Sequence, residues 1–155
     1  MLIGKDILLR YLKLDDLEFL YSIENNINYF KFNDDPKFYS REALRNYIKN
    51  SISDISVYNQ LRFVIESNKK SIGFVDLFDY DANLRSAGIG IIVKEEFQGL
   101  NYGSQSLELL ISFAWGELDL LTLYANIKSN NIKSIRLFKK FGFLKKDELL
   151  FQLNR

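Results

Sequence analysis

Cysteine and histidine are both absent from the 155 residues of this chain, and Pro36 is its only proline. Without the first two residue types, a cysteine nucleophile, a Ser-His-Asp triad and a zinc site built on Cys and His are excluded. No acidic cluster has the spacing of a calcium-binding loop, so we expect no metal ion. Any chemistry must therefore use carboxylates, tyrosine, lysine, hydroxyl groups, backbone dipoles, water or a cofactor.

A strong charge of one sign and long apolar runs are also lacking. Lys and Arg number 21 against 20 Asp and Glu, a formal net charge of +1, so we expect no nucleic-acid partner. The apolar runs are too short to span a bilayer, and residues 1–10 lack the features of a signal peptide. We therefore predict no membrane association and a cytoplasmic location. The length fits a single domain over residues 1–155.

Hydrophobic periodicity predicts a mixed α/β (α+β) fold with a mixed sheet. The predicted order is strand, two helices, three strands, helix, strand, helix, strand. The predicted strands cover residues 7–12, 60–67, 71–80, 84–93, 120–127 and 149–153. The first predicted helix starts near residue 14, and the second follows Ser40 as N-cap and continues to Ile52. The third follows the loop at residues 99–104. The fourth starts at residue 131, and Gly142 is its expected C-cap.

Glycines mark the segment most suited to ligand binding. Gly88 and Gly90 lie inside the strand at residues 84–93, which indicates a bulge or the close approach of another backbone or ligand. The loop that follows this strand, residues 98–104, then opens a helix. Helix N-termini expose free N–H groups and a partial positive charge, and such ends bind phosphate. An ordinary strand-to-helix turn has the same local pattern, so both interpretations stay open for this segment alone.

Two motifs together resemble the GNAT superfamily of acetyl-coenzyme A-dependent N-acetyltransferases. The phosphate loop of that family reads Q/R-x-x-G-x-G/A, and its later helix reads N-x-x-a-i-x-l-Y-x-k-x-G-F. The matching segments here are Gln98-Gly99-Leu100-Asn101-Tyr102-Gly103-Ser104 and Asn131-Ile132-Lys133-Ser134-Ile135-Arg136-Leu137-Phe138-Lys139-Lys140-Phe141-Gly142-Phe143. More narrowly, Asn25-Asn26 and the segments at residues 34–36, 62–66 and 72–77 resemble the bacterial spermidine/spermine N-acetyltransferases.

This resemblance implies a GNAT-like fold, acetyl-CoA as cosubstrate and transfer of its acetyl group to a primary amine of a small acceptor, with polyamines as candidates. Transfer would occur by direct attack in a ternary complex. Backbone groups of Ile91 and Val93, near the expected bulge, would hold the pantetheine and the thioester oxygen. The full implied cofactor-binding set is Ile91, Ile92, Val93, Gln98, Gly99, Leu100, Asn101, Tyr102, Gly103, Ser104, Asn131 and Phe138.

The chain departs from the family pattern at three places. Asn101 stands where the loop usually has glycine, although asparagine tolerates left-handed backbone angles. Phe138 occupies the position of the frequent general-acid tyrosine, so that role must pass to another group, for which Tyr124 is a candidate, or be dispensable. The C-terminal hairpin is expected to be shortened. Its open edge suggests a homodimer or higher homo-oligomer.

Acidic residues supply the candidates for proton transfer and acceptor binding. A mostly protonated amine needs a proton acceptor, and Asp76, in the otherwise apolar strand at residues 71–80, is the first candidate. Glu66 is the second. Asp34 and Asp35, together with Asp76, are candidate contacts for a cationic acceptor. Ordinary surface acids are the alternative for each of these residues.

Other interpretations remain open at this stage. Lys139 and Lys140 are candidates for contact with the cofactor's 3′-phosphate or for a solvated helix face. The acceptor could instead be a protein N-terminus or an antibiotic amine. A non-catalytic acetyl-CoA or polyamine sensor is the alternative outside the enzyme class, and Asn101 and Phe138 favour it.

Overall fold

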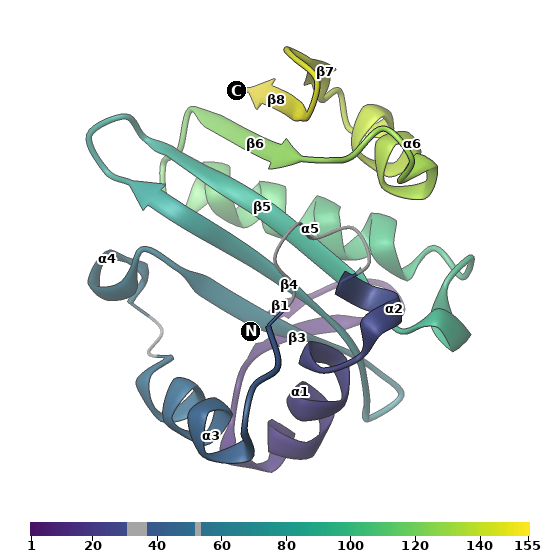
Figure 1. Cartoon of the computed structure of the whole chain (residues 1–155). Coiled ribbons are helices and arrows are strands. Elements are labelled where there is room, and N and C mark those ends of the chain that lie inside the picture. The colour runs from purple at the N-terminus through teal and green to yellow at the C-terminus, as the bar shows by residue number, and fades with distance from the viewer. Residues whose placement is uncertain (31–36, 52–53) are drawn as a thin grey trace.

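An eight-stranded sheet organises the chain (Figure 1), and this computed structural model describes residues 1–30, 37–51 and 54–155. The strand order is β1-β2-β3-β4-β5-β6-β8-β7. The β5–β6 pair is parallel, and the other neighbours are antiparallel. The strands are β1 (Leu2–Ile3), β2 (Leu8–Tyr11), β3 (Leu61–Ser67), β4 (Lys70–Asp81), β5 (Ser86–Val93), β6 (Thr122–Asn126), β7 (Leu144–Lys145) and β8 (Leu150–Asn154).

Helices cover both faces of this sheet (Figure 1). The helices are η1 (Leu14–Asp16), α1 (Leu17–Glu24), α2 (Ile27–Phe30), α3 (Arg41–Asn50), α4 (Ile55–Tyr58), η2 (Glu95–Phe97), α5 (Tyr102–Gly116) and α6 (Ile132–Lys140). On one face, α1 and α3 pack against Val64, Phe74 and Ile92, whose side chains share one face because strand residues alternate. On the other face, α5 and Phe138 of α6 join the larger apolar core.

The predicted mixed α/β fold is confirmed, and its predicted elements occur close to their expected bounds. Ser40 caps α3 as predicted, because its Oγ accepts a hydrogen bond from Ala43 N at 3.1 Å. Gly142 ends α6 with φ +89°, a left-handed value that favours glycine. The two-residue length of β7 agrees with the expected short hairpin. The predicted end of α3 at Ile52 lies outside the described residues.

The predicted bulge in β5 is wrong, because the irregular strand is its neighbour β4. The register between the two strands shifts between Phe78 and Asp81 of β4, where Asp79 has φ 48°. Gly88 instead makes room for an aromatic ring, since a Cβ there would lie 2.3 Å from a ring carbon of Phe78. The close approach that Gly88 indicates is therefore a packing contact within the sheet.

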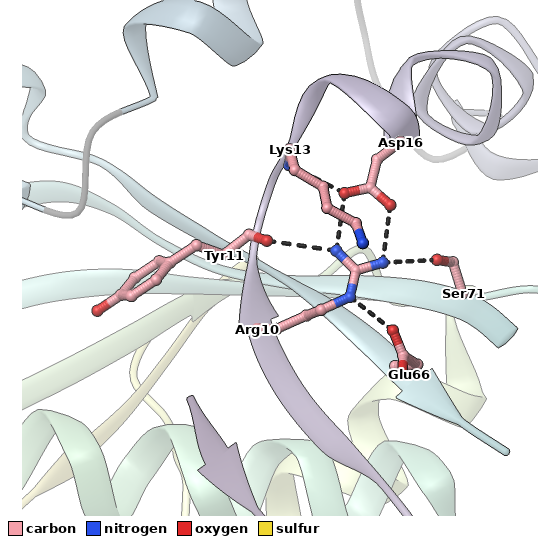
Figure 2. Close-up of polar contacts among 6 residues, drawn as sticks. All are labelled: Arg10, Tyr11, Lys13, Asp16, Glu66 and Ser71. Carbon is pink, nitrogen blue, oxygen red and sulfur yellow. Dashed lines mark hydrogen bonds and ion pairs between the residues drawn. The ribbon is translucent and has the colours of Figure 1, made fainter. Parts of the chain in front are cut away.

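A partly buried ion-pair network joins four elements around Arg10 of β2 (Figure 2). Arg10 Nη1 and Nη2 each donate to Asp16 of η1 at 2.8 Å, and Nε donates to Glu66 of β3 at 2.6 Å. Nη2 also lies 3.1 Å from Ser71 Oγ of β4, and Lys13 N donates to Asp16 Oδ2 at 2.9 Å. The guanidinium thus fixes the start of α1 on the sheet.

Burial alone would raise the pKa of Asp16, but the hydrogen bonds from Arg10 and Lys13 N outweigh it and lower the pKa below its ordinary value. The sequence suggests only that Asp16 complements the helix dipole. Its main partner is instead Arg10, a partly buried cation of β2. Because the folded-state pKa is lowered, the stability that Asp16 contributes is present above its unfolded pKa and is lost as the pH falls through the folded value.

Replacing Asp16 by asparagine is expected to lower the free energy of unfolding by about 3 kcal/mol, since one partner of a buried ion pair is lost. The difference from the native chain should shrink as the pH falls below about 4, where the native carboxylate is also protonated. Urea unfolding at several pH values measures both effects.

Glu18→Gln is the matched control, because Glu18 also pairs with an arginine, Arg41, yet its side chain is 68% exposed. We expect a much smaller change from this variant. An Asp16→Asn effect no larger than the control would contradict a structural role for the Arg10 network.

Candidate active site

The sheet opens between β5 and β6, and this opening holds a cavity. Pairing between the two strands covers only Ser86–Gly88 and Thr122–Tyr124, and no further pair is formed between them among the described residues. A cavity of about 260 Å³ lies where they diverge. Its lining residues are Ile23, Glu24, Tyr29, Asp76, Ile89, Gly90, Ile91, Ile92, Ala125, Asn126, Ile127, Lys128, Asn131, Ser134 and Phe138.

Main-chain groups of β5 point into this opening at every second residue. Lys94 N donates to Ile72 O at 2.8 Å just beyond the end of the β4–β5 pair. In an antiparallel ladder the bonded positions alternate, so the even-numbered residues of β5 pair with β4. The N–H and C=O groups of Ile91 and the N–H of Val93 are therefore directed toward β6, where the strand partner has moved away, while Val93 O accepts from Gln98 Nε2. An extended amide-containing ligand can bond to such a strand edge.

The loop between η2 and α5 presents a helix N-terminus beside the same strand. Gln98 Nε2 donates to Val93 O at 2.9 Å, which attaches the loop to the end of β5. Asn101 has φ 65°, so the expected left-handed conformation is found, and its side chain makes no capping hydrogen bond. The first intrahelical bond runs from Gln105 N to Asn101 O. The N–H groups of residues 102–104 precede it and are available to an anion.

Two lysines of α6 reach this helix N-terminus. Lys133 Nζ donates to Gln98 Oε1 at 3.1 Å, and Lys140 Nζ donates to Ser104 Oγ at 3.1 Å. A Cβ at Gly103 would lie 3.5 Å from Leu137, so α5 and α6 approach each other closely here. Positive side chains and the helix dipole thus act together on one surface. Lys133 is a contact that the sequence analysis missed.

A row of three residues crosses the sheet on the α1 side of the cavity. The strand register places Arg62 of β3 opposite Asp76 of β4, and Asp76 opposite Gly90 of β5. Arg62 Nε lies 3.8 Å from Asp76 Oδ1, and the Asp76 side chain is 15% exposed. A Cβ at Gly90 would lie 3.3 Å from Asp76 Oδ1, so the missing side chain gives the carboxylate room. The close approach expected at Gly90, like the one at Gly88, is therefore a contact within the sheet.

Glu24, the last residue of α1, completes this charged cluster. Arg62 Nη1 donates to Glu24 Oε1 at 2.6 Å. Burial raises the pKa of Asp76; the Arg62 cation lowers it only in part, while the Glu24 carboxylate raises it further. Glu24 and Asp76 bring two carboxylates to the cavity, and Arg62 and Lys128 bring two cations, so the formal charges balance; the two carboxylates are the groups that can contact a cationic ligand. Sequence reasoning identified Asp76 but missed Glu24.

Several predicted residues lie in the same cavity as Asp76. Ile91, Ile92, Asn131 and Phe138 all line it. Asn131 also caps α6, since its Oδ1 accepts from Ser134 N at 3.3 Å. Phe138 is buried and packs edge-to-face against another aromatic ring. The cavity thus combines predicted cofactor contacts with the first candidate for proton transfer.

Other predicted residues lie elsewhere. Glu66 pairs with Arg10 and lines a second cavity, of about 550 Å³, beside Lys5 and Tyr102. Tyr124 is outside the lining of the Asp76 cavity, and its hydroxyl lies 3.4 Å from Asp79 Oδ2. Asp34 and Asp35 lie outside the described residues. Lys139 is exposed, and the described contact to the loop comes from Lys140.

Tyr29, a phenol that the sequence analysis did not consider for proton transfer, also lines the cavity. Tyr29 belongs to α2, and its hydroxyl oxygen accepts a hydrogen bond from Glu95 N at 3.1 Å. Nearby, the Asn25 side chain exchanges two hydrogen bonds with the main chain of Tyr39, at 2.9 and 2.8 Å. The segment after α1 is thus attached both to the start of α3 and to the turn before the loop.

Neither a membrane span nor a metal cluster is found in the part of the chain that the structure describes. None of its helices is both long and apolar enough to cross a bilayer. The Asp and Glu side chains in that part form no group of three or more placed to hold a metal ion.

Comparison with known proteins identifies the family. A family model described as "Acetyltransferase (GNAT) domain" matches residues 6–144. The chain belongs to the GNAT acetyltransferase family, as the loop and the later helix predict. The spermidine N(1)-acetyltransferase of Escherichia coli (strain K12) is 26% identical over 144 residues, covering 93% of this chain and 76% of the relative. The enzyme of the same name from Vibrio cholerae serotype O1 is 27% identical over 143 residues, covering 92% and 81%.

Solved structures share the fold. The spermidine N-acetyltransferase from Vibrio cholerae in complex with CoA and spermine matches with a TM-score of 0.85 at 23% identity, covering 96% of this chain and 94% of that chain. A dodecameric structure of the Vibrio cholerae enzyme matches with a TM-score of 0.80 at 22% identity, covering 97% and 95%. The prediction of an N-acetyltransferase is confirmed at the level of the family, whose acetyl donor is acetyl-CoA.

If the N-terminus of α5 holds the phosphates, replacing Lys133 and Lys140 together by alanine is expected to weaken CoA binding about tenfold, because two positive charges beside that helix end are lost. The loss should shrink at high salt, which screens exposed charges. Calorimetric titration with CoA at low and high salt measures both effects.

The matched control replaces Lys145 and Lys146 of the C-terminal hairpin by alanine, which removes the same charge from another exposed surface. Equal weakening in the two double variants would show that only net charge matters and would contradict a local anion site.

Proposed function

We propose that the chain transfers the acetyl group of acetyl-CoA to a primary amine of a small polycationic acceptor, such as spermidine or spermine. The observation that carries this proposal is the cavity between β5 and β6, which combines a free strand edge with the charged row Arg62–Asp76. The carboxylates of Asp76 and Glu24 in the cavity lining can contact an ammonium group. Relatives with spermidine N-acetyltransferase activity in their names support the same acceptor class.

The proposed cofactor contacts use the main chain of β5 and the N-terminus of α5. Main-chain groups of Ile91 and Val93 would bond to the pantetheine amides, and the N–H groups of residues 102–104 would bond to the pyrophosphate. Lys133 and Lys140 would add positive charge beside those phosphates. These contacts would bring the thioester to the end of the cavity nearest Gly90 and Asp76, since β5 runs from there toward the loop.

Asp76 is the proposed proton acceptor. The bound ammonium must lose a proton before its nitrogen can attack, and Asp76 lies in the cavity with a pKa that burial raises. A raised carboxylate pKa brings the base closer to the working pH. The amine nitrogen then forms a bond to the thioester carbon, the carbon–sulfur bond breaks, and the nitrogen gives up its second proton to solvent to become the amide. The sulfur leaves as a thiolate that takes up one proton from solvent or a nearby acid.

Tyr29 is a candidate for that acid, because Phe138 has no proton to donate. Its hydroxyl oxygen already accepts from Glu95 N, so its own proton is free to be donated. The N–H of Glu95 would also stabilise the resulting phenolate. Tyr124 is less suited, since its hydroxyl contacts Asp79 away from the cavity lining.

The assembly and location of the chain stay predictions. We propose a homo-oligomer, and the dodecameric structure of a protein with the same fold supports that possibility. The cytoplasmic location predicted from the sequence is retained as part of the same proposal.

The direct test incubates the chain with acetyl-CoA and a panel of amines, and measures thiol release together with the mass of the product. We expect release with spermidine and spermine. Asp76→Asn should lower the rate about a hundredfold or more, which is the usual contribution of a positioned base. Asp79→Asn is the matched control, because Asp79 lies on the same strand outside the cavity lining.

Two outcomes would contradict this proposal. CoA binding without thiol release on any amine would favour the non-catalytic sensor. Release with an N-terminal peptide or an antibiotic amine, but with no polyamine, would keep the enzyme class and replace the acceptor.

A further inference from the structure

Arg62 lies at the centre of the charged cluster, yet part of its guanidinium lacks a hydrogen-bond partner. Its Nη1 donates to Glu24 at 2.6 Å. Its Nε is buried, has no hydrogen-bond partner among the described residues, and lies 3.8 Å from Asp76 Oδ1. Arg62 is thus hydrogen-bonded to Glu24 but acts on Asp76 only through its charge. The carboxylate oxygens of Asp76 therefore keep capacity for another donor.

Two aromatic rings hold the guanidinium in this place. The Arg62 guanidinium carbon lies 5.6 Å from the ring centre of Tyr47 on α3 and 5.7 Å from that of Phe74 on β4. Such contacts stabilise a cation on an aromatic surface. Burial raises the pKa of the Tyr47 phenol, so this ring stays neutral and adds no charge beside Asp76. The position of Arg62 is therefore fixed from three elements.

The groups around the Asp76 carboxylate come from every element packed against it. They are Arg62 on β3, Glu24 on α1, Tyr47 on α3, Tyr29 on α2, Lys128 after β6 and the Gln60 amide before β3, while Gly90 on β5 contributes no side chain. Arg62 favours the charged form of the carboxylate, and Glu24 opposes it. These two residues therefore act in opposite directions on the same group.

We propose that Glu24 and Arg62 are positioning residues of the transfer site, in which Glu24 holds the Arg62 guanidinium in place and Arg62 keeps Asp76 charged and ready to accept a proton from the acceptor amine. This inference rests on the proposed function for its role in catalysis. The charge coupling itself is a property of the chain without any substrate. Its consequence is that loss of the Arg62 charge and loss of the Glu24 charge shift the titration of the Asp76 carboxyl in opposite directions.

The signs follow from simple electrostatics. Loss of the Arg62 cation destabilises the Asp76 carboxylate, so its titration moves to higher pH and the acidic limb of the rate profile moves with it. Loss of the Glu24 charge stabilises the carboxylate and releases Arg62 toward it, so the titration moves to lower pH. If the ion pair between Glu24 and Arg62 had only a structural role, the two variants would not shift the Asp76 titration in opposite directions, because each would only disturb the packing around the cavity.

The first experiment titrates the Asp76 side-chain carboxyl by carbon NMR in the free chain, using Asp76→Asn to assign the signal. The variants are Glu24→Gln and Arg62→Met, with Arg62→Lys as the conservative replacement that restores the charge. Glu18→Gln and Arg41→Met are matched controls, because this pair joins α1 to α3 on the exposed surface. We expect opposite shifts for Glu24→Gln and Arg62→Met, a smaller shift for Arg62→Lys, and none for the controls.

The second experiment measures kcat/KM for the same variants as a function of pH. At a pH on the acidic limb, Arg62→Met should lose about tenfold more rate than at the plateau, because a carboxyl that titrates at higher pH is ionised in a smaller fraction of the molecules there. Glu24→Gln should retain its rate further into the acidic range. Because Arg62→Met leaves two carboxylates unpaired and could unfold, Glu24→Gln and Arg62→Lys provide independent tests.

The outcomes separate this inference from the proposed function. Shifts in the same direction, or no shift of the Asp76 signal in any folded variant, would overturn the inference even if polyamines are acetylated. No acetylation of any amine, combined with opposite NMR shifts, would overturn the proposed function and the catalytic role while leaving the charge coupling established.

Discussion

The early end of pairing between β5 and β6 is the constraint on which the candidate site depends. Beyond Gly88 and Tyr124 the two strands separate, yet neither loses its place in the sheet. β5 stays paired with β4 as far as Val93, and β6 stays paired with β8 along its whole length. The opening therefore leaves unpaired only main-chain N–H and C=O groups on the facing edges of β5 and β6, and a bound ligand can form hydrogen bonds with those groups.

The helix that borders this opening is held at both ends by arginines of the sheet. At its start, Arg10 binds Asp16, and at its end, Arg62 binds Glu24. Both arginines lie on the sheet face that α1 and α3 cover. A short helix of eight residues has little stability of its own, so these contacts and its apolar face determine its position. The same arrangement that fixes α1 thus delivers a carboxylate to the cavity.

Much of the candidate cofactor site could be predicted from sequence because its signals are local. A strand, a glycine-containing loop and a helix start follow one another from β5 to α5, and the cap at Asn131 and the end at Gly142 delimit α6. The left-handed angle at Asn101 follows from the backbone tolerance of asparagine. These features need no knowledge of distant contacts, and they are found where the sequence places them.

The acceptor side could not be predicted in the same way, because strand register decides it. The turn at the β3–β4 hairpin pairs Ser67 with Lys70, and continuing that register would place Val75 opposite Arg62. An irregularity between Ile65 and Glu66 shifts the pairing by one residue and brings Arg62 opposite Asp76 instead. A one-residue shift changes the face on which partners meet.

Long-range ion pairs account for the remaining differences between prediction and structure. Glu24 is 38 residues from Arg62 along the chain, and its role has no local signal. Glu66 looks like a free acid in the sequence but pairs with Arg10. The irregularity lies in β4, between Phe78 and Asp81, and Gly88 of β5 instead makes room for the Phe78 ring. In each case the deciding partner is on another element.

If the proposed function is right, the thioester and the amine meet in the opening between β5 and β6, beside Asp76. A crystal structure with a conjugate of CoA and acetylated spermidine tests this most directly. We expect the pantetheine amides to bond to the main chain of Ile91 and Val93, with the transferred nitrogen within hydrogen-bond reach of Asp76. A conjugate bound elsewhere, such as in the second cavity beside Tyr102, would contradict this placement.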